Sequence, residues 1–201
     1  MSTDQKRSFI ARIRCDDTPM KFFEQMLGNS AGQGNLLTTS HRYSNLSQRM
    51  VRAHRTYDRT VRHRSSEMVV YFRCYDDYYN IQIRSEAYLG KYFSKNPHGL
   101  LGAFAGAGGN TTSFNLLNMD HDIITLDDLK KDKATVYLKA RNADIIKRHV
   151  VENLKLYAYT DQVGEPVTFT LKILERDAPY QTGSTPYPLF IEPRIQDDDE
   201  M

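Results

Sequence analysis

The chain has no tryptophan, only two cysteines and little net charge. Two cysteines, Cys15 and Cys74, do not make a disulfide scaffold, and we expect both to be reduced thiols. A formal net charge of +2 gives no global attraction to nucleic acid, so any such attraction must be local. No apolar run approaches the roughly 20 residues that a membrane-spanning helix needs, so we expect no membrane span.

The sequence patterns that mark enzymes and metal sites are missing as well. None of the six histidines stands at the HxxxH or HExxH spacing of a zinc site, and the cysteines form no Cys-x-x-Cys pair. There is no Gly-x-Ser-x-Gly elbow, and the glycines between Gly106 and Gly109 are not followed by the Lys-Ser/Thr of a phosphate loop. We therefore expect no catalytic residues, no metal and no cofactor, and hence a non-enzymatic binding module.

Composition fits one soluble globular domain with a tail: 201 residues, 40% hydrophobic and 26% charged. The amino terminus has a charged start but lacks the apolar centre of a secretory signal. We expect a cytoplasmic protein, with the nucleus as the alternative compartment.

The stretch from Tyr79 to Asp120 predicts four short strands. Ile81 and Ile83 alternate with polar residues, as in a strand with one buried face. Strands at Lys91–Phe93, Leu100–Phe104 and Ser113–Leu117 follow, separated by turn residues such as Asn96-Pro97-His98-Gly99.

The same unit recurs twice, which indicates a three-fold internal repeat. Leu138-Lys139-Ala140 aligns with Ile83-Arg84-Ser85, and Phe169 then aligns with Phe114. In the first copy, Phe9–Cys15 matches the opening strand and Lys21-Phe22-Phe23 matches Lys91-Tyr92-Phe93.

Three units of four strands predict an all-β fold, a β-trefoil, which is a six-stranded barrel capped by three hairpins. The domain spans residues 8–175, with units of about 8–74, 75–133 and 134–175, and residues 176–201 form a Pro-rich linker and acidic tail. Inward-facing residues of a closed barrel recur between units, so the predicted core consists of Ile13, Ile81, Ile83, Leu100, Phe114, Val136, Leu138, Leu154 and Phe169.

Among trefoils, the Gly90-Lys91-Tyr92-Phe93 motif, followed by a turn and Gly99-Leu100-Leu101, resembles the fascin and hisactophilin branch. Fibroblast growth factors carry a comparable segment. The resemblance covers roughly residues 8 to 175 and is clearest in 79–175. It implies a protein-interaction module with actin as the family's best-known partner.

The most basic window of the chain is Gln48–Arg64, which has no counterpart in the other copies and is predicted to be an insertion in the first unit. Four of its arginines fall at steps of three, four and three, which would line one face of a helix; a solvated loop is the alternative. An arginine face suits phosphates, of nucleic acid or of an acidic lipid head group. The candidate site residues are Arg49, Arg52, Arg55, Tyr57, Arg59, Arg62 and Arg64.

Three local features lead to further expectations. Met20–Leu27 fits either a strand, as the repeat suggests, or a short helix after Thr18 and Pro19. Tyr75–Tyr78 predicts a hairpin turn, because Asp tolerates a left-handed backbone. Leu126 and Leu129 predict a short helical turn capped by Thr125.

Asp197–Glu200 are four consecutive acidic residues just before the final Met201, and they can compete internally for the arginine face. Three binding functions therefore stay open: a fascin-like protein-interaction module, an anion-binding trefoil, and a carbohydrate-binding trefoil. The last lacks tryptophan and so has no Gln-x-Trp repeat of the ricin type.

Overall fold

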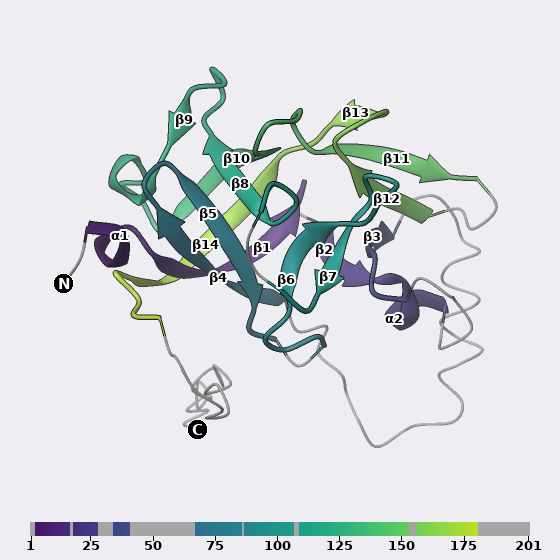
Figure 1. Cartoon of the computed structure of the whole chain (residues 1–201), viewed down its shortest axis with the longest axis horizontal. Coiled ribbons are helices and arrows are strands. Elements are labelled where there is room, and N and C mark those ends of the chain that lie inside the picture. The colour runs from purple at the N-terminus through teal and green to yellow at the C-terminus, as the bar shows by residue number, and fades with distance from the viewer. Residues whose placement is uncertain are drawn as a thin grey trace, which may run out of the picture.

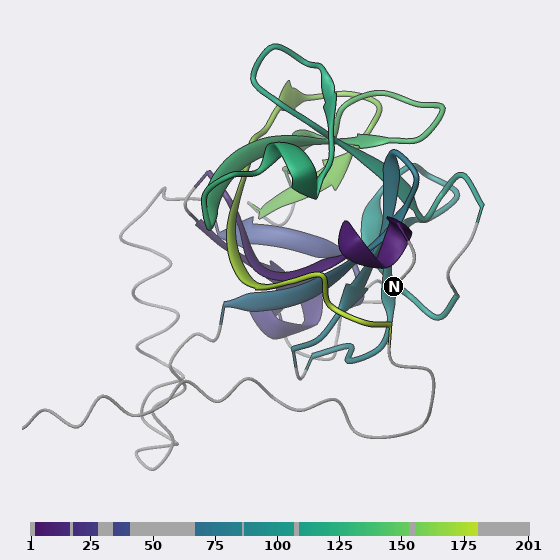
Figure 2. The same ribbon diagram turned by 90° about the vertical axis from the view of Figure 1, so that its left-hand side faces the viewer.

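Six antiparallel strands close into a barrel. The structure is a computed structural model and describes residues 3–16, 18–27, 34–40, 67–85, 87–106, 109–152 and 156–180. Each barrel strand is hydrogen-bonded to the next around the ring, and the last returns to the first. In ring order they are β1 (Phe9–Cys15), β4 (Met68–Tyr75), β5 (Tyr78–Ile83), β8 (Ser113–Leu117), β10 (Lys133–Ala140) and β14 (Phe169–Arg176). Figure 1 shows these strands, and in Figure 2 the purple β1 and the yellow β14 run side by side.

Hairpin strands lie outside the ring. They pair as β2 (Thr18–Phe22) with β3 (Leu37–Ser40), β6 (Tyr92–Lys95) with β7 (Leu101–Phe104), and β11 (Lys147–Val151) with β12 (Leu156–Thr160). The smaller elements are α1 (Thr3–Lys6), α2 (Phe23–Leu27), β9 (Ile123–Ile124), the 3-10 turn η1 (Leu126–Asp128) and β13 (Glu165–Pro166). The predicted all-β class and closed six-stranded barrel are confirmed, and the arrangement is compatible with a β-trefoil.

Alternation along the barrel strands places one set of side chains inside the ring. In β4, Met68, Val70, Phe72 and Cys74 are buried, while Val69 and Arg73 are partly exposed on the outer side. This is the two-residue period of a strand that packs on one face. Phe9 stacks on Phe72 with ring centroids 4.4 Å apart, which joins the first strand of the ring to its neighbour.

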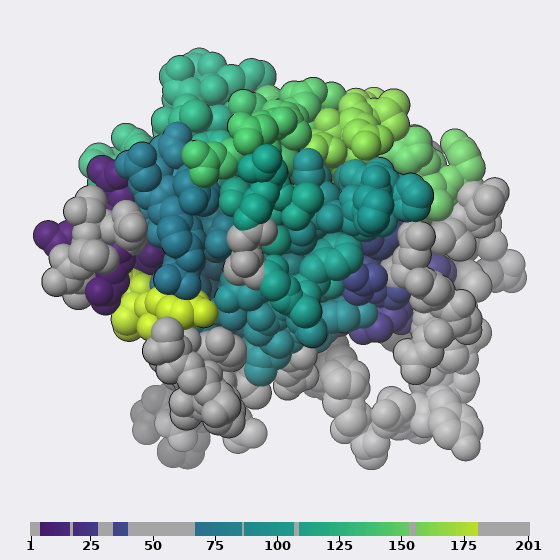
Figure 3. Space-filling view, in the orientation of Figure 1, coloured from purple at the N-terminus to yellow at the C-terminus, as the bar shows by residue number. Residues whose placement is uncertain are grey.

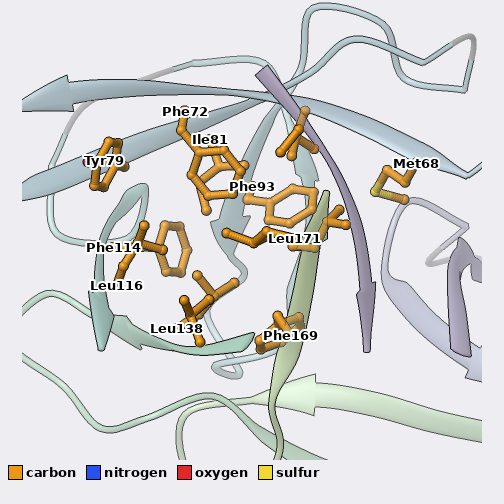
Figure 4. Packing of buried hydrophobic residues seen from close by; sticks show 14 of the residues in the cluster. Met68, Phe72, Tyr79, Ile81, Phe93, Phe114, Leu116, Leu138, Phe169 and Leu171 are labelled. Atoms are coloured by element: carbon orange, nitrogen blue, oxygen red, sulfur yellow. The ribbon is translucent and has the colours of Figure 1, made fainter. Parts of the chain in front are cut away.

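Most of the predicted core is confirmed. Figure 4 shows side chains from several barrel strands converging on one interior. Seven of the nine predicted positions belong to this cluster and have no exposed surface: Ile13, Ile81, Ile83, Phe114, Val136, Leu138 and Phe169. Leu154 lies outside the described residues.

The prediction for Leu100 is wrong. Leu100 is half-buried and packs in a separate small cluster with Phe23 and Leu36, whereas Leu101 is fully buried in the main core. Successive strand residues point to opposite faces, so an alignment that is off by one residue selects the wrong side chain.

Both alternatives for Met20–Leu27 are realised in part. The segment is a strand through Phe22 and becomes the helix α2 at Phe23. Phe22 enters the main core, and Phe23 packs in the smaller cluster with Leu36. Each Phe therefore has its own apolar environment, and the change from strand to helix lies between them.

The two predicted turns are confirmed. Asp76 adopts a left-handed backbone (φ 58°) between Tyr75 and Tyr78, whose rings stack at 5.5 Å. Leu126 and Leu129 are buried under η1, and the Thr125 N–H donates to the Asp128 carboxylate at 2.8 Å.

Cys15 and Cys74 are free, buried thiols. Burial raises the pKa of Cys15 to about 12, and the neighbouring Tyr159 phenol opposes this shift in part. Burial also raises the pKa of Tyr159. Both groups therefore favour their neutral forms in the folded state.

We expect the protein to lose stability in alkali. The folded state holds the Cys15 proton up to about pH 12, whereas the unfolded thiol releases it near its ordinary pKa of 9.0. Above that value the unfolded state binds fewer protons, so the free energy of unfolding falls as the pH rises toward 12, and below it the contribution is fully present. Urea unfolding between pH 8 and about 11 measures this. Cys15→Ala should make the decline shallower; equal slopes in both proteins would contradict the assignment.

Candidate anion-binding face

Three cationic side chains lie in one row across the outer wall of the barrel. In the register of strands β10, β14 and β1, Lys133 is directly opposite Lys172, and Lys172 is directly opposite Arg12. Neighbouring strands are about 4.8 Å apart, so the row spans roughly 10 Å. Like charges directly opposite each other on a sheet repel, which makes this row unfavourable unless an anion lies close by.

Arg14 and Thr170 form the next row, because they are directly opposite each other two positions along the same strands. Glu67, just before β4, is an ion-pair partner of both Arg14 and Arg12, with an Arg12 Nη1 to Glu67 Oε2 distance of 3.6 Å. One carboxylate is thus shared by two guanidinium groups.

The second nearby carboxylate, Asp132, is an ion-pair partner of Arg176 at 3.3 Å. Lys133 and Lys172 are exposed and have no ion-pair partner among the residues that the structure describes. Lys133, Lys172 and Asp132 line a concavity of about 370 Å³ together with the residues of the neighbouring row. We call it the cationic face, defined by Arg12, Arg14, Glu67, Asp132, Lys133, Thr170 and Lys172.

The cationic face presents mainly positive charge and hydrogen-bond donors. Its donors are guanidinium, ammonium and hydroxyl groups, and its carboxylates are engaged with arginines. Guanidinium groups match the geometry of phosphate and carboxylate oxygens, while lysines act as point charges on flexible stems.

The site predicted from the sequence contains no described residue, so its position relative to the cationic face is not compared. Arg49, Arg52, Arg55, Tyr57, Arg59, Arg62 and Arg64 all lie outside the described residues, so that site stays a prediction. Arg64, the last residue of the predicted site, stands shortly before Glu67 in the sequence, and Glu67 belongs to the cationic face.

Sequence reasoning missed the cationic face because its cations are far apart along the chain. Arg12, Lys133 and Lys172 come together only when the first and last strands close the ring. The available signal was the alternation of Arg12 and Arg14 with apolar residues in the opening strand, which places both arginines on the outer wall.

A second concavity, of about 780 Å³, lies along β11 and the turns beside it. Val150 and Val163 line it and are 40% and 62% exposed. Arg148 lies over the Tyr157 ring at 4.7 Å and is 3.3 Å from the Asp16 carboxylate. Gly164 packs closely on the backbone of Arg148, since a Cβ there would lie 2.2 Å from the Arg148 carbonyl oxygen.

His98 and His149 also line that second concavity. Within the described part of the chain, no group of three or more His, Cys, Asp or Glu side chains gathers to hold a metal ion. Among the same residues, no helix is long and apolar enough to cross a membrane.

Comparison with known proteins gives this chain no family: no family model matches it, and no curated protein matches it.

Proposed function

We propose that this chain is a β-trefoil binding module whose cationic face binds a phosphate-rich polyanion, either nucleic acid or an acidic lipid surface. The observation that carries the proposal is the position of Lys172, which has a cationic neighbour directly opposite it on each adjacent strand, Lys133 and Arg12. A bound polyanion would offset the repulsion within this row and release its own counterions, which makes such binding favourable and sensitive to salt.

The trefoil part of the proposal is supported by the order of the strands. Each hairpin, β2–β3, β6–β7 and β11–β12, falls in sequence between two strands of the ring. Large buried side chains also recur in or directly before the first strand of each hairpin, at Phe22, Phe93 and Ile146. A three-fold repeat would produce this pattern.

The second candidate function is a protein-interaction module, with actin as the partner that the fascin-like resemblance implies. It is favoured by the second concavity, where Val150 and Val163 expose apolar surface beside an aromatic ring. Exposed apolar surface of this kind often marks a protein contact.

A double substitution tests the polyanion proposal. We expect Lys133→Gln/Lys172→Gln to weaken binding of a labelled single-stranded oligonucleotide about tenfold or more and to lower the salt-dependence slope by about 2, because each lysine lost removes about one phosphate contact. Fluorescence anisotropy over a salt series measures both quantities. Co-sedimentation with vesicles containing a phosphoinositide distinguishes a lipid surface from nucleic acid.

The matched control is Lys91→Gln/Lys139→Gln, which removes the same charge from positions outside the cationic face. Unchanged affinity and salt slope in Lys133→Gln/Lys172→Gln would contradict the proposal. If an Arg52→Gln/Arg55→Gln/Arg59→Gln/Arg62→Gln variant then lost binding, the arginine-rich window would be the site.

A further inference from the structure

We propose that the acidic residues Asp197–Glu200 occupy the cationic face in the free protein and so compete with its partner. The contact itself requires only the cationic face; its role as a competitor rests on the proposed function.

The described chain ends in a strap, Asp177–Tyr180, that is held against the barrel. The Ala178 N–H donates to the Ser8 carbonyl at 2.9 Å, and the Tyr71 hydroxyl donates to the Ala178 carbonyl at 3.1 Å. Ala178 is buried, and the Arg73 guanidinium lies 3.8 Å from the centre of the Tyr180 ring. In Figure 3 the yellow end of the chain packs against the blue surface of β4 and β5. Tyr180, the last described residue, is therefore held at a fixed point on the barrel.

That point lies next to the cationic face. Ala178 packs with Tyr71, and Val69 packs against the same cluster. Val69 is directly opposite Arg12, which is directly opposite Lys172. Tyr180 lies beside Arg73, four residues along β4 from Val69. With strands about 4.8 Å apart and residues about 3.3 Å apart along a strand, Tyr180 and the cationic row are separated by roughly 15–20 Å.

The chain beyond the strap is long enough to return to this row. From Tyr180 to Asp197, a fully extended chain spans up to about 60 Å, several times the distance to be covered. A segment tethered so close to its binding site has an effective concentration on the order of millimolar, so even a weak contact is populated.

The acidic residues and the cationic face carry complementary charges. Asp197, Asp198, Asp199 and Glu200 are consecutive carboxylates. The cationic face holds four cations, of which two share Glu67 and two are exposed lysines with no ion-pair partner in the described ranges. Exposed ion pairs are individually weak, so a partner with more charges can displace the acidic residues.

Zero-length crosslinking of the full chain tests the contact without any partner. A carbodiimide joins carboxylates to amines that touch, and mass spectrometry then identifies the linked peptides. We expect links from Asp197–Glu200 to Lys133 or Lys172 that vanish in high salt. Links only to other lysines would overturn the proposal, and so would the absence of any link. The absence of any link is also the result expected if Asp197–Glu200 bind Gln48–Arg64, because that window contains no lysine.

Competition is tested by the full-length variant Asp197→Asn/Asp198→Asn/Asp199→Asn/Glu200→Gln. If the acidic residues cover the face most of the time, oligonucleotide affinity should rise roughly 3- to 10-fold. The charge-matched control neutralises four exposed carboxylates elsewhere, Asp120, Asp122, Glu152 and Glu165, and should give a smaller gain.

The two proposals can fail separately. Crosslinks to Lys133 or Lys172 in a protein that binds neither oligonucleotide nor vesicles would support the contact and overturn the polyanion function. Oligonucleotide binding that depends on Lys133 and Lys172, with no gain on neutralising the acidic residues, would support the function and overturn the competition.

Discussion

Phe114→Ala and Phe169→Ala should each lower the free energy of unfolding by about 3–5 kcal/mol, the usual cost of truncating a fully buried Phe. Both side chains have no exposed surface and lie in the main core. Phe169 begins β14, which pairs with both β1 and β10, and its ring lies 6.0 Å from that of Tyr159. Removing either ring leaves a cavity that a closed barrel has little freedom to fill.

Guanidinium unfolding of each variant measures this loss. Leu100→Ala is the control, since Leu100 is only half-buried in the smaller cluster and should cost less. An effect below about 1 kcal/mol for either Phe would show that the core is not packed as described, because surface substitutions fall in that range.

Asp161→Leu should lower the free energy of unfolding by about 3–5 kcal/mol, because it leaves a buried charge without its partner. The Lys95 ammonium is an ion-pair partner of the Asp161 carboxylate, and the two side chains are only 13% and 6% exposed. Lys95 ends β6 and Asp161 directly follows β12, so the pair ties two hairpins together. The nearby Gly99, with φ 75°, packs against Asp161 and Gln162.

A double variant separates the ion pair from simple loss of packing. Lys95→Met/Asp161→Leu removes both charges and should recover most of the lost stability. The comparison is Asp144→Leu, which breaks an exposed ion pair with Lys147 in which the Asp144 side chain is 58% exposed, and should cost about 1 kcal/mol or less. If the double variant were as unstable as Asp161→Leu alone, the loss would come from the packing of the Asp161 side chain and not from the unpaired charge on Lys95.

The sequence contained enough information for several of the strands and for both predicted turns. Alternation around Ile81 and Ile83, and the Asp76-Asp77 pair between two tyrosines, are local signals that depend on few neighbours. The change from strand to helix between Phe22 and Phe23 could not be located from the sequence. The strand buries Phe22 in the main core and the helix buries Phe23 in the smaller cluster, so the boundary depends on tertiary packing. The prediction that Leu100 belongs to the core was wrong for a related reason. Two leucines in succession allow two registers, and only the pairing of β7 with β6 places Leu101 in the core.

The cationic face could not be predicted from any single stretch of the sequence. Lys172 is a single lysine in a strand whose inward residues are Phe169, Leu171 and Ile173. It becomes part of a row only through two cross-strand registers, with Arg12 on one side and Lys133 on the other. A slip of one residue in either pairing would remove a cation from that row: Ala11 or Ile13 would replace Arg12, or Asp132 or Ala134 would replace Lys133.

Pairing of the first strand with the last also constrains how the protein can be made in a cell. Phe9 at the start of β1 is opposite Arg176 at the end of β14, so the ring cannot close until nearly the whole described chain has been synthesised. At about 5–20 residues per second, β1 would wait roughly 8–30 s after its own synthesis for this partner. During that time β1 would keep an unpaired edge, and β10 would do so from its own synthesis until β14 is made; unpaired edges promote association with other chains. Nascent chains of this protein should therefore depend on chaperones more than the finished barrel does.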